Sequence, residues 1–290
     1  MTFMTSPTSH ADSSPHAARQ THRLAFIGGG NMASAIIGGL IKQGLSASYI
    51  AVVEPFAEAR IRLIAQYGVQ VQEHADASLQ SATLVIWAVK PQTFRDAAAL
   101  TATFTAQALH LSVAAGIRSD SIAQWLGTER VVRAMPNTPA LVGRGISGLF
   151  ARDAVTAQDK ALVQSVIATT GEHLWLDTEA QLDAVTALSG SGPAYVFYFL
   201  EAMVQAGVGM GLSPENARQL AISTFSGTAE LARQSIEPLE LLRERVTSKG
   251  GTTYAAICSM ERDSIKPHFV QAMHAACERA AELGDEFGAA

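Results

Sequence analysis

Residues 24–33, Leu-Ala-Phe-Ile-Gly-Gly-Gly-Asn-Met-Ala, decide the fold of this chain. A short apolar run ends in a G-x-G-x-x-A turn, and residues 35–41 (AIIGGLI) continue with apolar side chains at helical spacing. In such a strand–turn–helix unit Gly28 permits the tight turn, Gly30 lets backbone N–H groups approach a pyrophosphate, and Ala33 allows close packing of the helix on the strand. The diphosphate lies at the positive end of the helix dipole. The segment therefore predicts a dinucleotide-binding unit.

Size and charge restrict the class of protein further. The chain has 290 residues, enough for two domains, and 48% of them are apolar against 16% that are charged. A net charge of −5 provides no basic field for nucleic acid or for an anionic membrane surface. No apolar run approaches the ~20 residues of a membrane span. We expect a cytoplasmic protein without nucleic-acid or membrane partners, and a disordered tail at residues 1–20, which lack the apolar stretch of a signal peptide.

The side chains that usually bind metals are scattered along the chain. Cys258 and Cys277 are its two cysteines, too few for a disulfide framework at this length. Two unpaired cysteines fit a reducing compartment. We expect both to lie in the interior, where cysteine packs as a small apolar residue. The histidines show no metal-ligand spacing with them. We therefore expect no metal site.

Periodicity predicts an α/β domain at residues 21–177. Short apolar runs that read as strands alternate with helical segments such as 58–67, a pattern typical of a doubly wound, Rossmann-type sheet. The run at 83–89 is apolar throughout, as a strand buried on both faces requires. The strands after the first are expected at 49–53, 69–71, 83–89, 109–113, 130–135, 145–150 and 173–176.

Beyond Asp177 the pattern is helical only, so residues 178–290 are predicted to form an all-α domain for substrate binding and oligomerisation. The segment at 193–210, PAYVFYFLEAMVQAGVGM, is apolar nearly all round, and such a helix must be buried on every side. A domain of this size offers little interior. We therefore expect burial against a second copy of the chain, as a homodimer or a higher oligomer of dimers. Further helices are expected at 213–235, 253–262 and 268–283.

Residues 246–253, VTSKGGTT, form the second informative segment. Hydroxyl side chains and two glycines at the start of a helix can form an anion cradle, because free backbone N–H groups and the helix dipole point the same way. Since the cofactor phosphates have their own turn, this cradle would bind a substrate carboxylate. A capped helix with a flexible Gly-Gly hinge explains the same residues equally well.

Six motifs resemble the Δ1-pyrroline-5-carboxylate reductases of proline biosynthesis, and the resemblance runs from about residue 23 to 285. It implies an enzyme that reduces the cyclic imine 1-pyrroline-5-carboxylate to L-proline by hydride transfer from NADPH or NADH. The motifs are FIGGGNMASAIIGGL at 26–40, AVKPQ at 88–92, AAG at 114–116, RAMPNTPA at 133–140, DAVTALSGSGPAY at 183–195 and VTSKGGTT at 246–253.

The same resemblance implies which residues form the site. Thr253 is the expected catalytic residue, since its hydroxyl can orient the ring nitrogen of an imine that, once protonated, already accepts hydride. The expected cofactor-binding residues are Gly28, Gly30, Asn31 and Met32 at the pyrophosphate, with Ala88, Val89, Lys90, Pro91, Ala114 and Ala115 on the nicotinamide side. The expected substrate-binding residues are Glu179, Ser248, Gly250, Gly251, Thr252 and Thr253.

Three positions depart from the family pattern. Lys249 stands where the family usually has proline, and Ala75 where many members have asparagine. Glu54 ends the second predicted strand, and we count it among the cofactor-binding residues, because an acid there ordinarily accepts hydrogen bonds from the ribose 2′-OH and repels a 2′-phosphate. The nearest base, Arg60, lies a helical turn or more into the next helix. The choice between NADH and NADPH stays open, with the family slightly favouring NADPH.

Two other functions fit part of the pattern, besides another NAD(P)-dependent imine oxidoreductase. β-Hydroxyacid dehydrogenases share the G-x-G-x-M turn and an all-helical second domain. Their chemistry uses a lysine on the long helix of that domain, and no lysine lies between residues 161 and 248. A non-catalytic dinucleotide sensor would leave the second anion cradle without a role.

Overall fold

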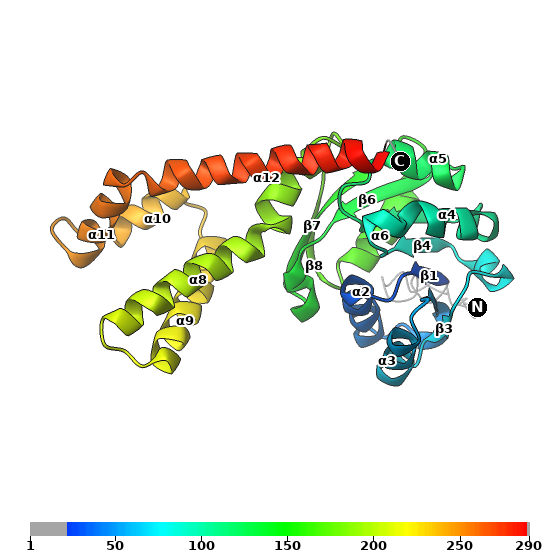
Figure 1. Cartoon of the computed structure of the whole chain (residues 1–290), viewed down its shortest axis with the longest axis horizontal. Coiled ribbons are helices and arrows are strands. Elements are labelled where there is room, and N and C mark those ends of the chain that lie inside the picture. The colour runs from blue at the N-terminus through cyan, green and yellow to red at the C-terminus, as the bar shows by residue number, and fades with distance from the viewer. Residues whose placement is uncertain (1–21, 289–290) are drawn as a thin grey trace, which may run out of the picture. The chain divides into compact units, whose positions relative to one another are not determined.

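The computed structural model describes residues 22–288, and these form two compact units (Figure 1). The first unit runs to Gly190 and takes up the chain again from Arg279, and the second is Ser191–Glu278. The tail predicted at residues 1–20 lies outside the described residues. The domain boundary predicted at residue 177 lies just after the last strand of the sheet, which ends at Trp175. The first unit extends further, to Gly190.

The first unit is built on one eight-stranded sheet in the order β3-β2-β1-β4-β5-β6-β7-β8. Neighbouring strands from β3 to β6 pair in parallel, β7 is antiparallel to β6, and β8 is parallel to β7. This order confirms the doubly wound, Rossmann-type sheet and places its switch point between β1 and β4, where such sheets bind ligands. The strands are β1 (Leu24–Ile27), β2 (Ile50–Val53), β3 (Gln70–Gln72), β4 (Leu84–Trp87), β5 (Leu109–Ser112), β6 (Val131–Met135), β7 (Gly145–Ala151) and β8 (Gly171–Trp175).

Helices cover both faces of this sheet. One face packs against α2 (Asn31–Lys42), α3 (Ala57–Tyr67) and α6 (Ala157–Ile167). The other packs against α4 (Pro91–Thr105) and α5 (Ser119–Leu126). A short helix, α7 (Gln181–Val185), follows β8.

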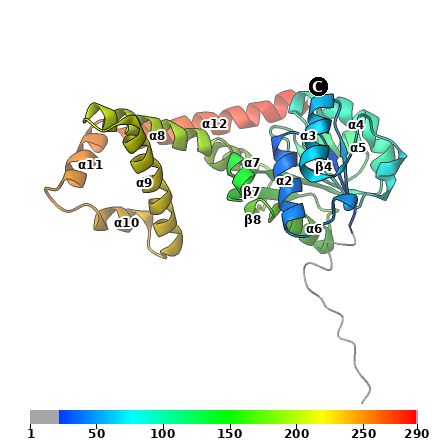
Figure 2. The same cartoon turned by 90° about the horizontal axis from the view of Figure 1, so that it is seen from below.

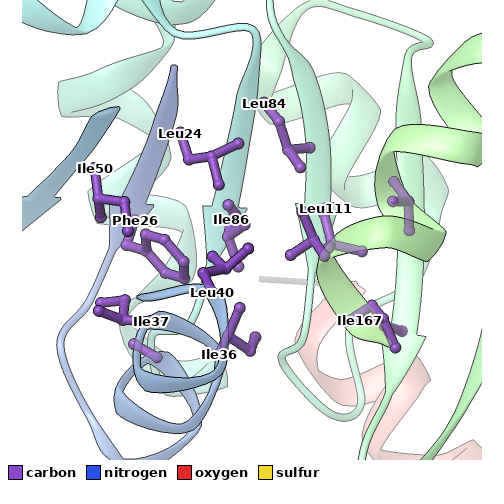
Figure 3. Packing of buried hydrophobic residues seen from close by; sticks show 14 of the residues in the cluster. Leu24, Phe26, Ile36, Ile37, Leu40, Ile50, Leu84, Ile86, Leu111 and Ile167 are labelled. Atoms are coloured by element: carbon purple, nitrogen blue, oxygen red, sulfur yellow. The ribbon is translucent and has the colours of Figure 1, made fainter. Parts of the chain in front are cut away.

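The core beneath α2 sets the position of the glycine turn. Ile36, Ile37 and Leu40 face the sheet at helical spacing and are buried against Phe26 of β1 and Ile86 of β4 (Figure 3). Because α2 begins directly after the turn, this packing fixes the start of the helix over the carboxyl end of β1.

A polar contact crosses the core between β4 and β5. The indole Nε1 of Trp87 donates to Nδ1 of His110 at 3.0 Å, and Nε2 of His110 lies 3.2 Å from the carbonyl oxygen of Thr105. Since an indole N–H can only donate, Nδ1 is the acceptor, and the neutral ring carries its proton on Nε2, which donates to Thr105. Burial lowers the pKa of His110 to about 4, against a usual 6.5.

We expect acid to destabilise the first unit through His110. A lowered pKa in the folded state means that the unfolded chain binds a proton which the core excludes, so the stability present above pH 6.5 is lost as the pH falls toward 4. The difference corresponds to about 3 kcal/mol. Urea unfolding between pH 7 and pH 4 measures it. His110→Asn keeps an acceptor for Trp87 without a titrating ring and should lose this part of the pH dependence, whereas an unchanged slope would contradict the assignment.

The second unit confirms the all-helical prediction for the C-terminal region. Its helices α8 and α9 are in contact with each other, and Figure 2 shows them diverging at an angle. The sequence pattern missed α10 and predicted α12 too short. The helices are α8 (Gly192–Gly209), α9 (Pro214–Gln234), α10 (Leu239–Arg245), α11 (Thr252–Arg262) and α12 (Ile265–Gly288), of which α12 belongs to this unit up to Glu278.

Apolar side chains of the second unit are largely exposed within the single chain. Phe197 and Tyr198 on α8 are 61% and 69% exposed. The residues that this unit buries are Gly207, Ala217 and Ala221, all small. Among residues 22–288, no helix is long and apolar enough to cross a membrane.

Candidate cofactor and substrate sites

The turn between β1 and α2 depends on two glycines that have no room for a side chain. Gly28 has φ +94°, and a Cβ there would lie 2.7 Å from the carbonyl oxygen of Ala88. A Cβ on Gly29 would collide with Leu63 and lie 3.2 Å from Oε2 of Glu54. Both glycines are therefore required by the packing of the protein itself.

Gly30, unlike Gly28 and Gly29, has open space where a side chain would lie. Apart from its neighbours in the chain, nothing among residues 22–288 lies within 4 Å of a Cβ placed there. Gly30 directly precedes α2, and no side chain caps this helix and no acid lies in its first turn. Free N–H groups at a helix start beside open space form a cradle for an anion, so Gly30, Asn31 and Met32 fit the diphosphate of a dinucleotide.

The residues predicted on the nicotinamide side follow two adjacent strands. Ala88, Val89 and Lys90 connect β4 to α4, which begins at Pro91, and the N–H of Ala88 donates to the carbonyl of Ile27 at 2.8 Å. Ala114 and Ala115 follow β5, which pairs with β4. The structure thus brings the predicted cofactor residues together at the carboxyl ends of β1, β2, β4 and β5, along one edge of the sheet.

The C-terminal end of α12 supports the segment after β5. Gly116 has φ +72°, and a Cβ there would lie 3.2 Å from Leu283 and from Phe287. Arg118 donates to Asp285 at 2.8 Å. Sequence reasoning missed this support, because nothing local in either segment signals the other.

Glu54 ties the end of β2 to the glycine turn. Its Oε2 accepts the N–H of Gly29 at 2.7 Å, its Oε1 accepts the N–H of Phe56 at 2.9 Å, and the residue is 6% exposed. The glycine pattern singled out Gly28 and Gly30 and missed Gly29, whose role becomes visible only beside Glu54. A direct contact of Glu54 with the cofactor stays a prediction.

Glu179 is held inside the first unit by three donors. Arg133 of β6 forms an ion pair with it at 2.6 Å, and the N–H and hydroxyl of Ser119 each donate to it at 2.6 Å. A hollow of about 380 Å³ lies beside it, lined also by Ser119, Asp120 and Arg152. The sequence analysis missed this cluster, and the signal that could have found it is Arg133, a charged residue in an otherwise apolar strand. The predicted contact of Glu179 with the substrate stays a prediction.

The substrate-loop residues lie in the second unit, between α10 and α11. Gly250 has φ +78°, and Gly251 precedes α11, which has no side-chain cap and no acid in its first turn. The side chains of Ser248, Thr252 and Thr253 are exposed. The start of α11 is therefore uncapped, which argues against the alternative of a capped helix, and its use as an anion cradle stays a prediction.

In the described part of the chain no group of three His, Cys, Asp or Glu residues could hold a metal ion. The sheet, its switch point and the uncapped turn define a protein of the dinucleotide-binding class.

Comparison with known proteins narrows this class. Residues 23–116 match the family model described as NADP oxidoreductase, coenzyme F420-dependent, and residues 179–283 match pyrroline-5-carboxylate reductase dimerisation. The pyrroline-5-carboxylate reductase of Pseudomonas aeruginosa is 45% identical over 92% of this chain and 99% of that protein. That of Haemophilus influenzae is 40% identical over 90% and 98%.

Solved structures agree. A pyrroline-5-carboxylate reductase from Coxiella burnetii superposes with a TM-score of 0.85 at 36% identity, covering 91% of this chain and 98% of the other. That of Plasmodium falciparum, with NADP bound, has a TM-score of 0.82 at 28% identity, covering 91% and 99%. This chain belongs to the pyrroline-5-carboxylate reductase family, which decides against a β-hydroxyacid dehydrogenase.

The ion pair of Glu179 gives a test that separates a structural from a substrate-binding role. Glu179→Ala should lower the free energy of unfolding by about 3–5 kcal/mol, because Arg133 would remain buried without its counter-charge. Urea unfolding measures this, and a double variant, Arg133→Met with Glu179→Leu, should recover much of the loss. Unchanged stability together with a raised KM for the substrate would contradict the structural role.

Proposed function

We propose that this protein reduces 1-pyrroline-5-carboxylate to L-proline by hydride transfer from NADPH or NADH. The observation that carries the proposal is the 45% identity to a pyrroline-5-carboxylate reductase over 92% of the chain, a range that includes both anion cradles. The substrate is a small molecule with a carboxylate, and the cofactor carries phosphates, so two cradles match two anionic ligands.

The first unit binds and shields the cofactor in this proposal. The N–H groups of Gly30, Asn31 and Met32 hold the diphosphate at the start of α2. When bound, the reduced nicotinamide supplies the hydride. The small apolar residues after β4 and β5, with the backbone beside them, line the ring and exclude water. They are Ala88, Val89, Ala114 and Ala115, with Lys90 and Pro91 at the start of α4.

The loop before α11 binds and orients the substrate in the same proposal. Backbone N–H groups at Gly250 and Gly251, with the hydroxyls of Ser248 and Thr252, receive the carboxylate, and Lys249 adds a positive charge. The hydroxyl of Thr253 accepts a hydrogen bond from the protonated ring nitrogen. Alignment of this kind can contribute ~7–11 kcal/mol without any titrating side chain.

Direct assay tests the proposal. Purified protein given 1-pyrroline-5-carboxylate and a reduced nicotinamide cofactor should form proline in equal amount to the cofactor oxidised. Proline is measured by chromatography and the cofactor by its absorbance. Cofactor oxidation without proline would point to another imine or carbonyl substrate, and no oxidation with either cofactor would contradict the proposal.

Thr253→Ala should lower kcat/KM for the imine about 5- to 150-fold, because one orienting hydrogen bond of ~1–3 kcal/mol is lost. Steady-state kinetics measures this effect, and cofactor affinity should stay within about twofold. Thr253→Ser keeps the hydroxyl and is the matched control. Full activity in Thr253→Ala would make the loop structural, whereas weakened cofactor binding would place the cofactor where we place the substrate.

We further infer that the protein is a homodimer, or an oligomer of dimers, joined through the second unit. The dimerisation family model covers residues 179–283, and α8 leaves its apolar side chains largely uncovered. We also infer that it works in the cytoplasm, since its free cysteines, Cys258 and Cys277, fit a reducing compartment. The expectation that both are interior residues is wrong for the single chain, in which Cys258 is exposed and Cys277 half-buried. Its net charge of −5 favours neither nucleic acid nor anionic membrane as a partner.

Phe197→Glu should dissociate or aggregate the protein. Phe197 is 61% exposed in the single chain, so the substitution costs little in a monomer but would bury a charge in the proposed interface, at several kcal/mol. Light scattering coupled to size-exclusion chromatography measures the mass. Glu201→Gln, on the same helix, is the control for handling and expression. A fully assembled, active Phe197→Glu protein would place the interface elsewhere.

A further inference from the structure

We propose that Glu54 makes this enzyme prefer NADH over NADPH, by accepting hydrogen bonds from the hydroxyls of the adenosine ribose and repelling a 2′-phosphate. The inference rests on the proposed function only in requiring a nicotinamide dinucleotide as the cofactor. It concerns the first unit alone, since β1, β2 and α3 all belong to it.

The carboxylate of Glu54 is fixed in place from both sides. Gly29 and Phe56 each donate a backbone N–H to one of its oxygens, at 2.7 and 2.9 Å. A carboxylate has about four acceptor positions, so lone pairs remain for two ribose hydroxyls. Because Glu54 is 6% exposed and anchored by these two bonds, it cannot swing away from an incoming phosphate without releasing the turn.

Of the two arginines near Glu54, Arg60 is bound to acceptors of the protein itself. The three residues after it, Pro55, Phe56 and Ala57, carry no positive charge. Arg60 donates through Nη1 to the carbonyls of Glu54 and Pro55, at 3.0 and 2.6 Å, and through Nη2 to Glu73 at 2.9 Å. Its side chain is 21% exposed, so a 2′-phosphate would have to compete with three acceptors for this group.

Arg62 is the cation that remains. One of its nitrogens donates to the carbonyl of Gly29 at 3.2 Å, and the residue is otherwise exposed. Gly29 belongs to the turn that wraps the diphosphate, so we assign the charge of Arg62 to the diphosphate. The alternative, that Arg62 receives a 2′-phosphate, predicts the opposite cofactor preference and is decided by the same measurements.

A dinucleotide with a 2′-phosphate would therefore bring up to two negative charges toward a fixed, buried carboxylate, while Arg60 is bound to protein acceptors and Arg62 is assigned to the diphosphate. A 2′-hydroxyl would instead donate to that carboxylate. The Plasmodium falciparum relative was solved with NADP bound, so a fold of this kind accepts a 2′-phosphate in another sequence. The preference proposed for this chain is therefore a property of residues such as Glu54 and not of the fold.

Binding without substrate tests the inference independently of catalysis. Titration of the protein with NADH and with NADPH, followed by calorimetry or cofactor fluorescence, should give a dissociation constant at least about 10-fold lower for NADH. Competition by 5′-AMP and by adenosine 2′,5′-bisphosphate should show the same order, because these probes differ only in the 2′-phosphate. Equal or tighter binding of NADPH by the wild-type protein would overturn the inference.

Variants identify the residue responsible. Glu54→Ser should shift the ratio of the two dissociation constants at least about 10-fold toward NADPH. Glu58→Gln is the matched control, because it also removes a negative charge from the first turn of α3, and it should leave the ratio unchanged. A folded Glu54→Ser protein with the wild-type ratio would overturn the inference. So would loss of NADPH binding in Arg62→Met with NADH binding retained.

Failure of the proposed function is distinguishable from failure of this inference. A protein that binds NADH tightly but forms no proline would refute the proposed reaction and leave the assignment of Glu54 standing. One that forms proline equally well from both cofactors, with equal dissociation constants, would refute the role of Glu54 and leave the reaction standing.

Discussion

The hydrogen bond from the N–H of Gly29 to the carboxylate of Glu54 is the constraint on which the cofactor site depends. It joins the end of β2 to the turn after β1, while Gly28 rests against the carbonyl of Ala88 after β4. Three neighbouring strand ends are therefore locked together before any ligand arrives. Since α2 starts from this turn, its free N–H groups are directed by backbone contacts rather than by a flexible side chain, which is the preorganisation that binding of an anion requires.

The two proposed anion cradles have the same local structure in a protein whose net charge is negative. Both α2 and α11 begin at a glycine, without a side-chain cap and without an acid in the first turn. The electrostatic field of a helix start acts over its first turn. Charges farther away than the Debye length of ~8–10 Å are largely screened by salt. In the proposed function the local dipoles would therefore decide where the anions bind, and the net charge of −5 would oppose them little.

Features with a local cause could be predicted from the sequence, and features made by distant pairs could not. The strand runs, the glycine turn and the change to helices each arise from neighbouring residues, and the structure confirms the resulting fold class. The pairs Glu54–Gly29 and Arg133–Glu179 join residues far apart in the chain, as does the packing of Phe287 on Gly116. Segment α10 was missed because its sequence, LELLRER, is short and mixes charge with apolar residues. The resemblance supplied the site residues, and their roles remain predictions.

The second unit fully buries only small residues, and in the proposed dimer this would link its folding to assembly. Its buried residues are Gly207, Ala217 and Ala221, which remove very little apolar surface from water, whereas ordering its helices costs entropy at every residue. Large side chains that would normally form a core, such as Phe197 and Tyr198, are instead exposed in the single chain. In the proposed dimer these same side chains become the interior. In such a dimer the stability of this unit would depend on protein concentration, as it does for obligate dimers.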